Sequence, residues 1–115
     1  MLLLMTVLVG AYCADDEAAL RAKLATKEGL AKLVIYEKLY YMALMTDDTE
    51  KQMQCMNEWV EATRKENVPE YEGYVLVNRA MFFYANDMND SIYLRVPADR
   101  ELMKRNSLWK EYYEL

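Results

Sequence analysis

Apolar residues recur at helical spacing along most of this 115-residue chain, and this pattern constrains its fold more than any other feature. The first segment with this spacing is expected over residues 15–44, with Gly29 as a candidate break. Acidic residues at its start suit the positive end of a helix dipole. Its recurring positions are Leu20, Leu24, Ala31, Val34 and Leu39. We expect core packing from this helix, and also from its tyrosines (Tyr36, Tyr40 and Tyr41), for which a binding surface is the alternative.

A second helix is expected from Asp47 to about Glu66. Asp47 is the predicted N-cap, and Glu50, three residues on, completes a capping-box pattern. One stripe of this helix is predicted to face the core. The stripe is Met53, Met56, Val60 and Thr63, with Cys55, Trp59 and Ala62 beside it.

The next segment is ambiguous between helix and strand. Pro69 suits the first turn of a helix, and one helical face is predicted to carry Tyr71, Tyr74, Val75, Met81, Phe82 and Ala85. The runs YVLV and MFFY within residues 71–85 also fit strands. Of the two, we favour the helix.

A last helix is expected to begin at Pro97, after a turn over residues 86–91 and a short apolar link over residues 92–96. Asp99 is its predicted N-cap. Leu102, Met103, Asn106, Trp109 and Tyr113 fall on one side of it. The chain is therefore predicted to form a mostly α, small antiparallel helical, repeat-like domain.

The amino terminus is typical of a secretory signal peptide. An apolar run over residues 2–9 is followed by small residues and then by the acids Asp15, Asp16 and Glu17. Cleavage after Cys13 places Ala11 and Cys13 at the two small-residue subsites. We therefore expect residues 1–13 to be the signal peptide and residues 14–115 the single mature domain, without a transmembrane segment. A buried apolar segment of a cytosolic protein is the alternative.

Cleavage there leaves Cys55 as the only cysteine, so it is predicted to be a free thiol. Burial is the usual state of such a cysteine. In the same compartment, Asn89 begins an Asn-Asp-Ser sequon and is a candidate glycosylation site.

Composition excludes several classes of function. The chain has no histidine, which rules out Ser-His-Asp and Cys-His catalysis and histidine-containing zinc or iron sites. Its three glycines are isolated, so it has no phosphate-binding loop. The net charge is −5, and the basic residues are interleaved with acids, which argues against nucleic-acid binding. We expect no enzyme activity and no cofactor.

Three stretches carry a resemblance to the helical repeat region of the leprecan family, which includes cartilage-associated protein and the prolyl 3-hydroxylases. They are residues 54–64 (QCMNEWVEATR), residues 79–88 (RAMFFYANDM) and residues 97–106 (PADRELMKRN) with Tyr112 and Tyr113 beyond. Two departures from the family pattern are Trp59, near where a second cysteine is usual, and a shorter link between the last two helices. The resemblance covers about residues 54–113.

The resemblance implies a non-catalytic scaffold or interaction module, linked to collagen modification in the endoplasmic reticulum. A protein partner is then expected, and helical repeats bind partners on extended surfaces. Trp109 is predicted to pack into the core. If it is exposed instead, Trp109, Tyr112 and Tyr113 are the candidate contact residues. The alternative is a secreted carrier of small ligands, because the opening LRAKLATKEGL after a signal is similar to arthropod salivary lipocalins.

The signal-peptide hypothesis predicts the mature amino terminus. N-terminal sequencing of secreted material should begin near Ala14. Recovery of intact Met1 from folded, cytosolic protein would contradict the hypothesis.

Overall fold

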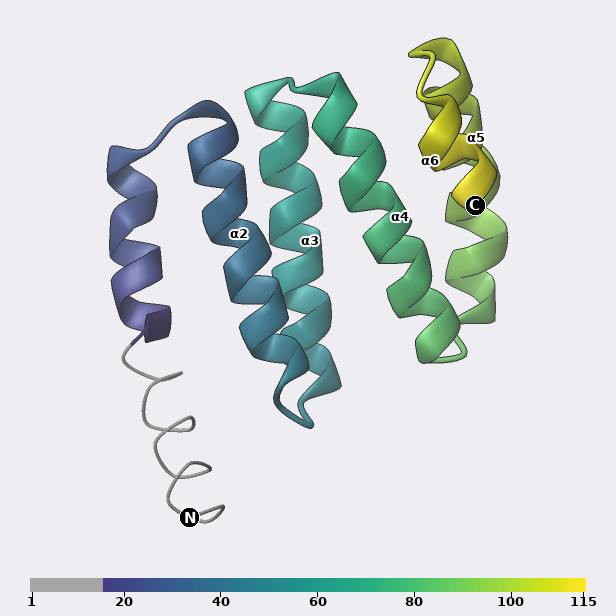
Figure 1. The fold of residues 1–115 in the computed structure, drawn as a ribbon. Helices are drawn as coiled ribbons and strands as arrows, with labels where there is room; N and C mark the ends of the chain where they lie inside the picture. Colours follow the sequence, from purple (N-terminus) through teal and green to yellow (C-terminus); the bar gives the residue numbers. More distant parts are fainter. Residues whose placement is uncertain (1–15) are drawn as a thin grey trace. The chain divides into compact units, whose positions relative to one another are not determined.

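The computed structural model describes residues 16–115, and these residues form helices and no strand (Figure 1). The mostly α fold is therefore confirmed, and residues 71–85 are helical. The expected signal peptide, with its cleavage site, lies outside the described residues. After a helical stretch over residues 16–23, the elements are η1 (Leu24–Thr26), α2 (Gly29–Leu44), α3 (Thr49–Glu66), α4 (Pro69–Ala85), α5 (Asn89–Arg105) and α6 (Trp109–Glu114).

The described residues form two compact units that divide within α3, after Trp59. In the first unit, two ion pairs attach the helical residues 16–23 to α3. Lys51 Nζ lies 2.8 Å from Glu17 Oε2, and Arg21 Nη1 donates to Glu58 Oε2 at 3.0 Å. Because Glu17 and Arg21 are four residues apart, both lie on the face of this helix that is turned toward α3.

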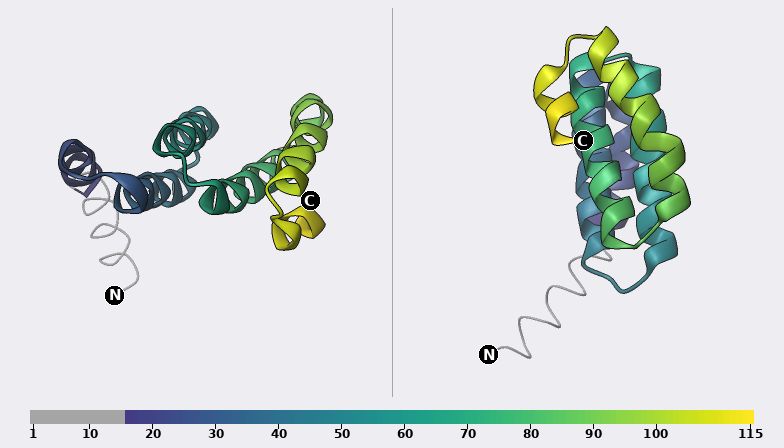
Figure 2. Two further views of the ribbon diagram at one scale, coloured as in Figure 1. Left: turned by 90° about the horizontal axis from the view of Figure 1, so that it is seen from above. Right: turned by 90° about the vertical axis from the view of Figure 1, so that its right-hand side faces the viewer.

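In the second unit, α4 packs against α5, and the short α6 contacts both (Figures 1 and 2). Gly73 allows α6 to approach α4 closely. A Cβ atom at this position would lie 3.0 Å from Leu108 Cδ1 and 3.1 Å from Glu111 Cγ. A larger residue at position 73 would therefore push α6 away from α4.

Successive helices begin at a fixed interval of 20 residues, at residues 29, 49, 69, 89 and 109. The last three turns share one geometry. Asn67, Asp87 and Ser107 have left-handed backbone conformations, with φ of 53°, 52° and 57°. The N–H of the residue that follows returns to the preceding helix, as in the bond from Met88 N to Phe83 O of 2.9 Å and that from Leu108 N to Met103 O of 2.8 Å. These are Schellman-type helix ends, which satisfy carbonyls left open by the last turn.

Because the interval is constant, residues 20 apart hold the same place in successive helices, and the same places are buried. The most regular sets of buried residues are Leu39, Trp59, Arg79 and Asp99, and Ala43, Thr63, Phe83 and Met103. The fold is thus repeat-like in its register as well as in its helix lengths. Each helix turns the same face toward its core.

One of these shared places holds a buried ion pair instead of an apolar contact. Arg79 Nη2 donates to both carboxylate oxygens of Asp99 at 3.0 Å, and each residue is only 5% exposed. The Arg79 guanidinium also lies 5.7 Å from the centre of the Phe83 ring. In the preceding two helices, Leu39 and Trp59 fill the equivalent place.

This arrangement corrects the prediction that Asp99 caps a helix starting at Pro97. Helix α5 begins at Asn89, so the expected link over residues 92–96 is helical and Pro97 lies inside α5. A proline inside a helix costs about 3 kcal/mol. Burial of Val96, Asp99 and Met103 against the rest of the unit opposes that cost. Local sequence rules do not take this tertiary burial into account.

Two other sequence predictions are corrected. The cap of α3 is Asp48, whose Oδ1 accepts the Lys51 N–H at 3.1 Å, so Asp47 is one residue too early. In α4, Tyr74, Met81 and Ala85 are exposed. Its buried residues are Gly73, Val75, Leu76, Val77, Arg79, Ala80, Phe82 and Phe83.

The ion pair yields a prediction about stability. Asp99→Ala leaves the Arg79 guanidinium buried without its counter-charge and should lower the free energy of unfolding by about 3–5 kcal/mol. The double variant Arg79→Leu/Asp99→Leu introduces the side chain that Leu39 places at the equivalent position. It should be close to wild type or more stable. Chemical denaturation measures the free energy of unfolding of both variants. A double variant no more stable than Asp99→Ala would contradict the prediction.

Candidate functional site

The outward face of α2 carries an apolar stripe, which we call the α2 stripe. Its residues are Leu30, Val34, Tyr41, Leu44 and Met45, which are 38–72% exposed. Their spacings place them within one face of the helix. Because the opposite face of α2 is also apolar, through Leu33, Leu39 and others, this helix is apolar nearly all round. Helices of that kind are usually buried on every side.

A second stripe lies on α4 at equivalent places. Tyr74, Met81 and Tyr84, here called the α4 stripe, are 37%, 62% and 55% exposed. They follow Val34, Tyr41 and Leu44 by 40 residues. The places that match Met81, Tyr84 and Ala85 are mostly charged in the other two long helices: Glu61, Arg64 and Lys65 in α3, and Glu101, Lys104 and Arg105 in α5. Helix α5 nevertheless also exposes apolar side chains near its start, because Tyr93 and Leu94 are 79% and 75% exposed and Leu94 follows Tyr74 by 20 residues.

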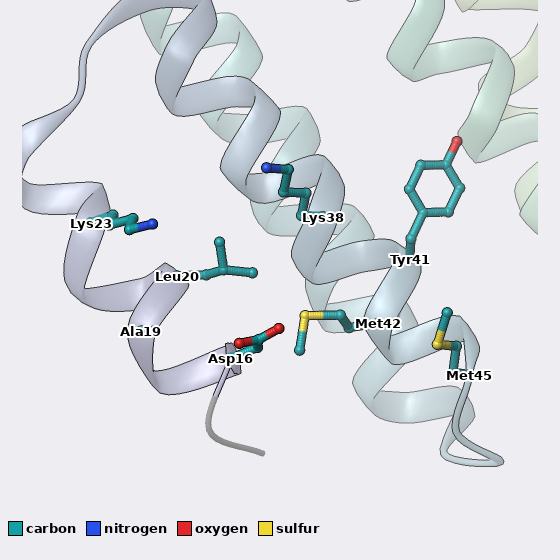
Figure 3. Close-up of a pocket in the computed structure, with 8 residues that line it drawn as sticks. All are labelled: Asp16, Ala19, Leu20, Lys23, Lys38, Tyr41, Met42 and Met45. Carbon is teal, nitrogen blue, oxygen red and sulfur yellow. The ribbon is translucent and has the colours of Figure 1, made fainter. Parts of the chain in front are cut away.

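A groove lies between the helical residues 16–23 and α2 in the first unit (Figure 3). Its volume is about 410 Å³. The lining residues are Asp16, Ala19, Leu20, Lys23, Lys38, Tyr41, Met42 and Met45. The groove thus combines apolar walls with charged groups, and Tyr41 and Met45 belong to both the groove and the α2 stripe.

The first helix offers mostly small and charged side chains to this groove. Ala19 is exposed and ends in a methyl group, and Asp16 and Lys23 carry charges. Leu20 is the larger apolar residue that this helix adds to the lining. Bulky apolar side chains of the first helix therefore do not fill the groove.

Of the predicted site residues, Cys55 is a free thiol that is 3% exposed. Burial raises the pKa of this thiol. Asn89 is exposed and is the first residue of α5.

The predicted aromatic contact is only partly described. Tyr113 is 79% exposed, whereas Tyr112 is half-buried, with the Arg100 guanidinium 4.6 Å from the centre of its ring. The two tyrosine rings lie 5.2 Å apart. Trp109 begins α6, and its side chain lies outside what the structure describes.

The tyrosines of α2 divide between core and surface. Tyr40 is buried, with its ring 5.6 Å from that of Trp59, and burial raises its pKa to about 12. Tyr41 is 39% exposed and lies in the α2 stripe. Neither stripe was predicted from the sequence, although apolar residues recur there 40 positions apart, at 34 and 74, 41 and 81, and 44 and 84.

No family model, no curated protein and no solved structure matches this chain. Within residues 16–115, acidic and cysteine side chains form no group of three or more suited to a metal ion. In the same residues, no helix is long and apolar enough to cross a membrane.

The burial of Cys55 predicts its reactivity. Native protein should react slowly with a thiol reagent, because the thiol is shielded and its raised pKa leaves less of the reactive thiolate. The same protein in denaturant should react rapidly and serves as the control. Equal rates in the two states would show that Cys55 is accessible.

Proposed function

We propose that this chain is a non-catalytic interaction module of the secretory pathway that binds a protein partner through its outward apolar stripes. The observation that carries the proposal is the recurrence of the stripes at equivalent places of α2 and α4. Tyrosine and methionine are enriched in protein interfaces relative to the rest of a protein surface. A stripe of exposed Tyr, Met, Leu and Val gains free energy when a partner removes it from water.

The charged outward faces of α3 and α5 support the same interpretation. Residues such as Arg64, Lys65 and Lys104 are exposed at places that match the apolar stripes. Exposed apolar residues scattered singly need no explanation. The recurrence of three exposed apolar places in both α2 and α4 distinguishes these stripes from scattered exposure.

We also propose that the partner belongs to the machinery of collagen modification in the endoplasmic reticulum. This part rests on the resemblance to the leprecan helical repeats over residues 54–113. The three resembling stretches fall on α3, on the end of α4 and within α5, so they follow the order of helices in the second half of the chain. A lipocalin-like carrier is not retained, because lipocalins are built of strands and residues 16–115 contain none.

A capture experiment with matched variants tests the stripes. Val34→Glu on α2 and Met81→Glu on α4 place a charge in each stripe. Ala31→Glu is the matched control, because Ala31 is exposed on α2 but lies outside the stripe. The mature protein serves as bait in a secretory extract. Each stripe variant should bind the partner at least about tenfold more weakly than wild type does, which corresponds to a loss of about 1.4 kcal/mol in binding free energy.

The control variant should capture the partner as well as wild type does. Equal capture by all four proteins would reject the stripes as the binding surface. The identity of the captured proteins tests the collagen assignment separately. A partner unconnected with collagen would reject that assignment and leave the interaction module in place.

A further inference from the structure

We propose that the groove between the helical residues 16–23 and α2 binds a medium-chain fatty acid or a similar amphiphilic carboxylate. The carboxylate would lie between Lys23 and Lys38, and the alkyl chain along Leu20 and Met42. This inference concerns a small ligand and does not depend on the protein partner proposed above.

The charge of the groove favours an anion. Lys23 extends from the first helix toward α2, and Lys38 extends from α2 toward the first helix (Figure 3). Neither ammonium group makes an ion pair within residues 16–115, whereas the nearby Arg21 and Lys51 are both paired with glutamates. In a chain of net charge −5, two unpaired cations facing one groove form a local site for negative charge.

The remaining lining favours an alkyl chain attached to that anion. Leu20 and Met42 project into the space between the two helices in Figure 3. Methionine adapts its shape to irregular apolar surfaces. The volume of about 410 Å³ lies within the range of small-molecule sites, roughly 300–1,000 Å³. A free inorganic anion would leave these apolar walls in contact with water.

The small side chain of Ala19 leaves room for the alkyl chain. Ala19 lines the groove beside Leu20 and is exposed. An alkyl chain lying along Ala19, Leu20 and Met42 would cover apolar surface that is now in contact with water and gain the free energy of apolar burial.

Filling the groove is the first test. Ala19→Leu places a larger side chain in the groove lining and should weaken decanoate binding about tenfold or more. Ala22→Leu is the matched control, because Ala22 is exposed on the same helix and does not line the groove. Calorimetric titration with decanoate, below its micellar concentration, measures the affinity. Circular dichroism confirms that both variants remain helical.

Charge variants test the position of the carboxylate. Lys23→Gln and Lys38→Gln should each weaken decanoate binding and leave the binding of neutral decanol unchanged. Asp16→Asn removes a negative charge from the lining and should strengthen decanoate binding. Because exposed charges are screened by salt, decanoate affinity should fall as ionic strength rises.

The proposal is overturned if wild-type protein does not bind decanoate, or if Ala19→Leu binds it as well as wild type does. Equal decanoate affinity of the two lysine variants and wild type would also overturn it. Val34→Glu and Met81→Glu lie outside the groove lining and should bind decanoate normally. Failure of the ligand site is therefore distinguishable from failure of the protein-binding stripes.

Discussion

The left-handed turns that follow α3, α4 and α5 set the register on which much of this structure depends. Asn67, Asp87 and Ser107 each reverse the chain with φ near 55° at the same point of the 20-residue interval. Asn and Asp tolerate this conformation better than most other residues. Because the turns recur at a constant interval, every long helix presents the same places to its core. A one-residue change in one turn would rotate the next helix by about 100°.

Because of this register, residues at the same place of different helices can be compared directly. The place that holds Leu39 and Trp59 in one pair of helices holds the Arg79–Asp99 ion pair in the next pair. A buried ion pair demands a specific partner, because either charge alone is costly in a low-dielectric interior. It therefore ties α4 to α5 more specifically than two leucines would.

The candidate sites follow from what the register leaves outside the core. In α2 and α4, several outward places are apolar, and the matching places in α3 and in the second half of α5 are mostly charged. The groove and the α2 stripe share Tyr41 and Met45, so a ligand in the groove would lie beside the surface proposed to contact a partner. Binding at the stripes would rest mainly on removing apolar area from water. Binding in the groove would add the attraction of Lys23 and Lys38 for an anion.

The sequence by itself determined the helices and several of their ends, because these depend on residues three or four apart. It predicted the burial of Cys55, the end of α3 at Glu66 and the start of α4 at Pro69. Local rules did not place the start of α5 or the cap of α3. Only the tertiary structure decided which face of α4 is buried, which residue neutralises Asp99, and that a groove lies between residues 16–23 and α2. Each of these depends on side chains about 20 residues away, which helical periodicity does not connect.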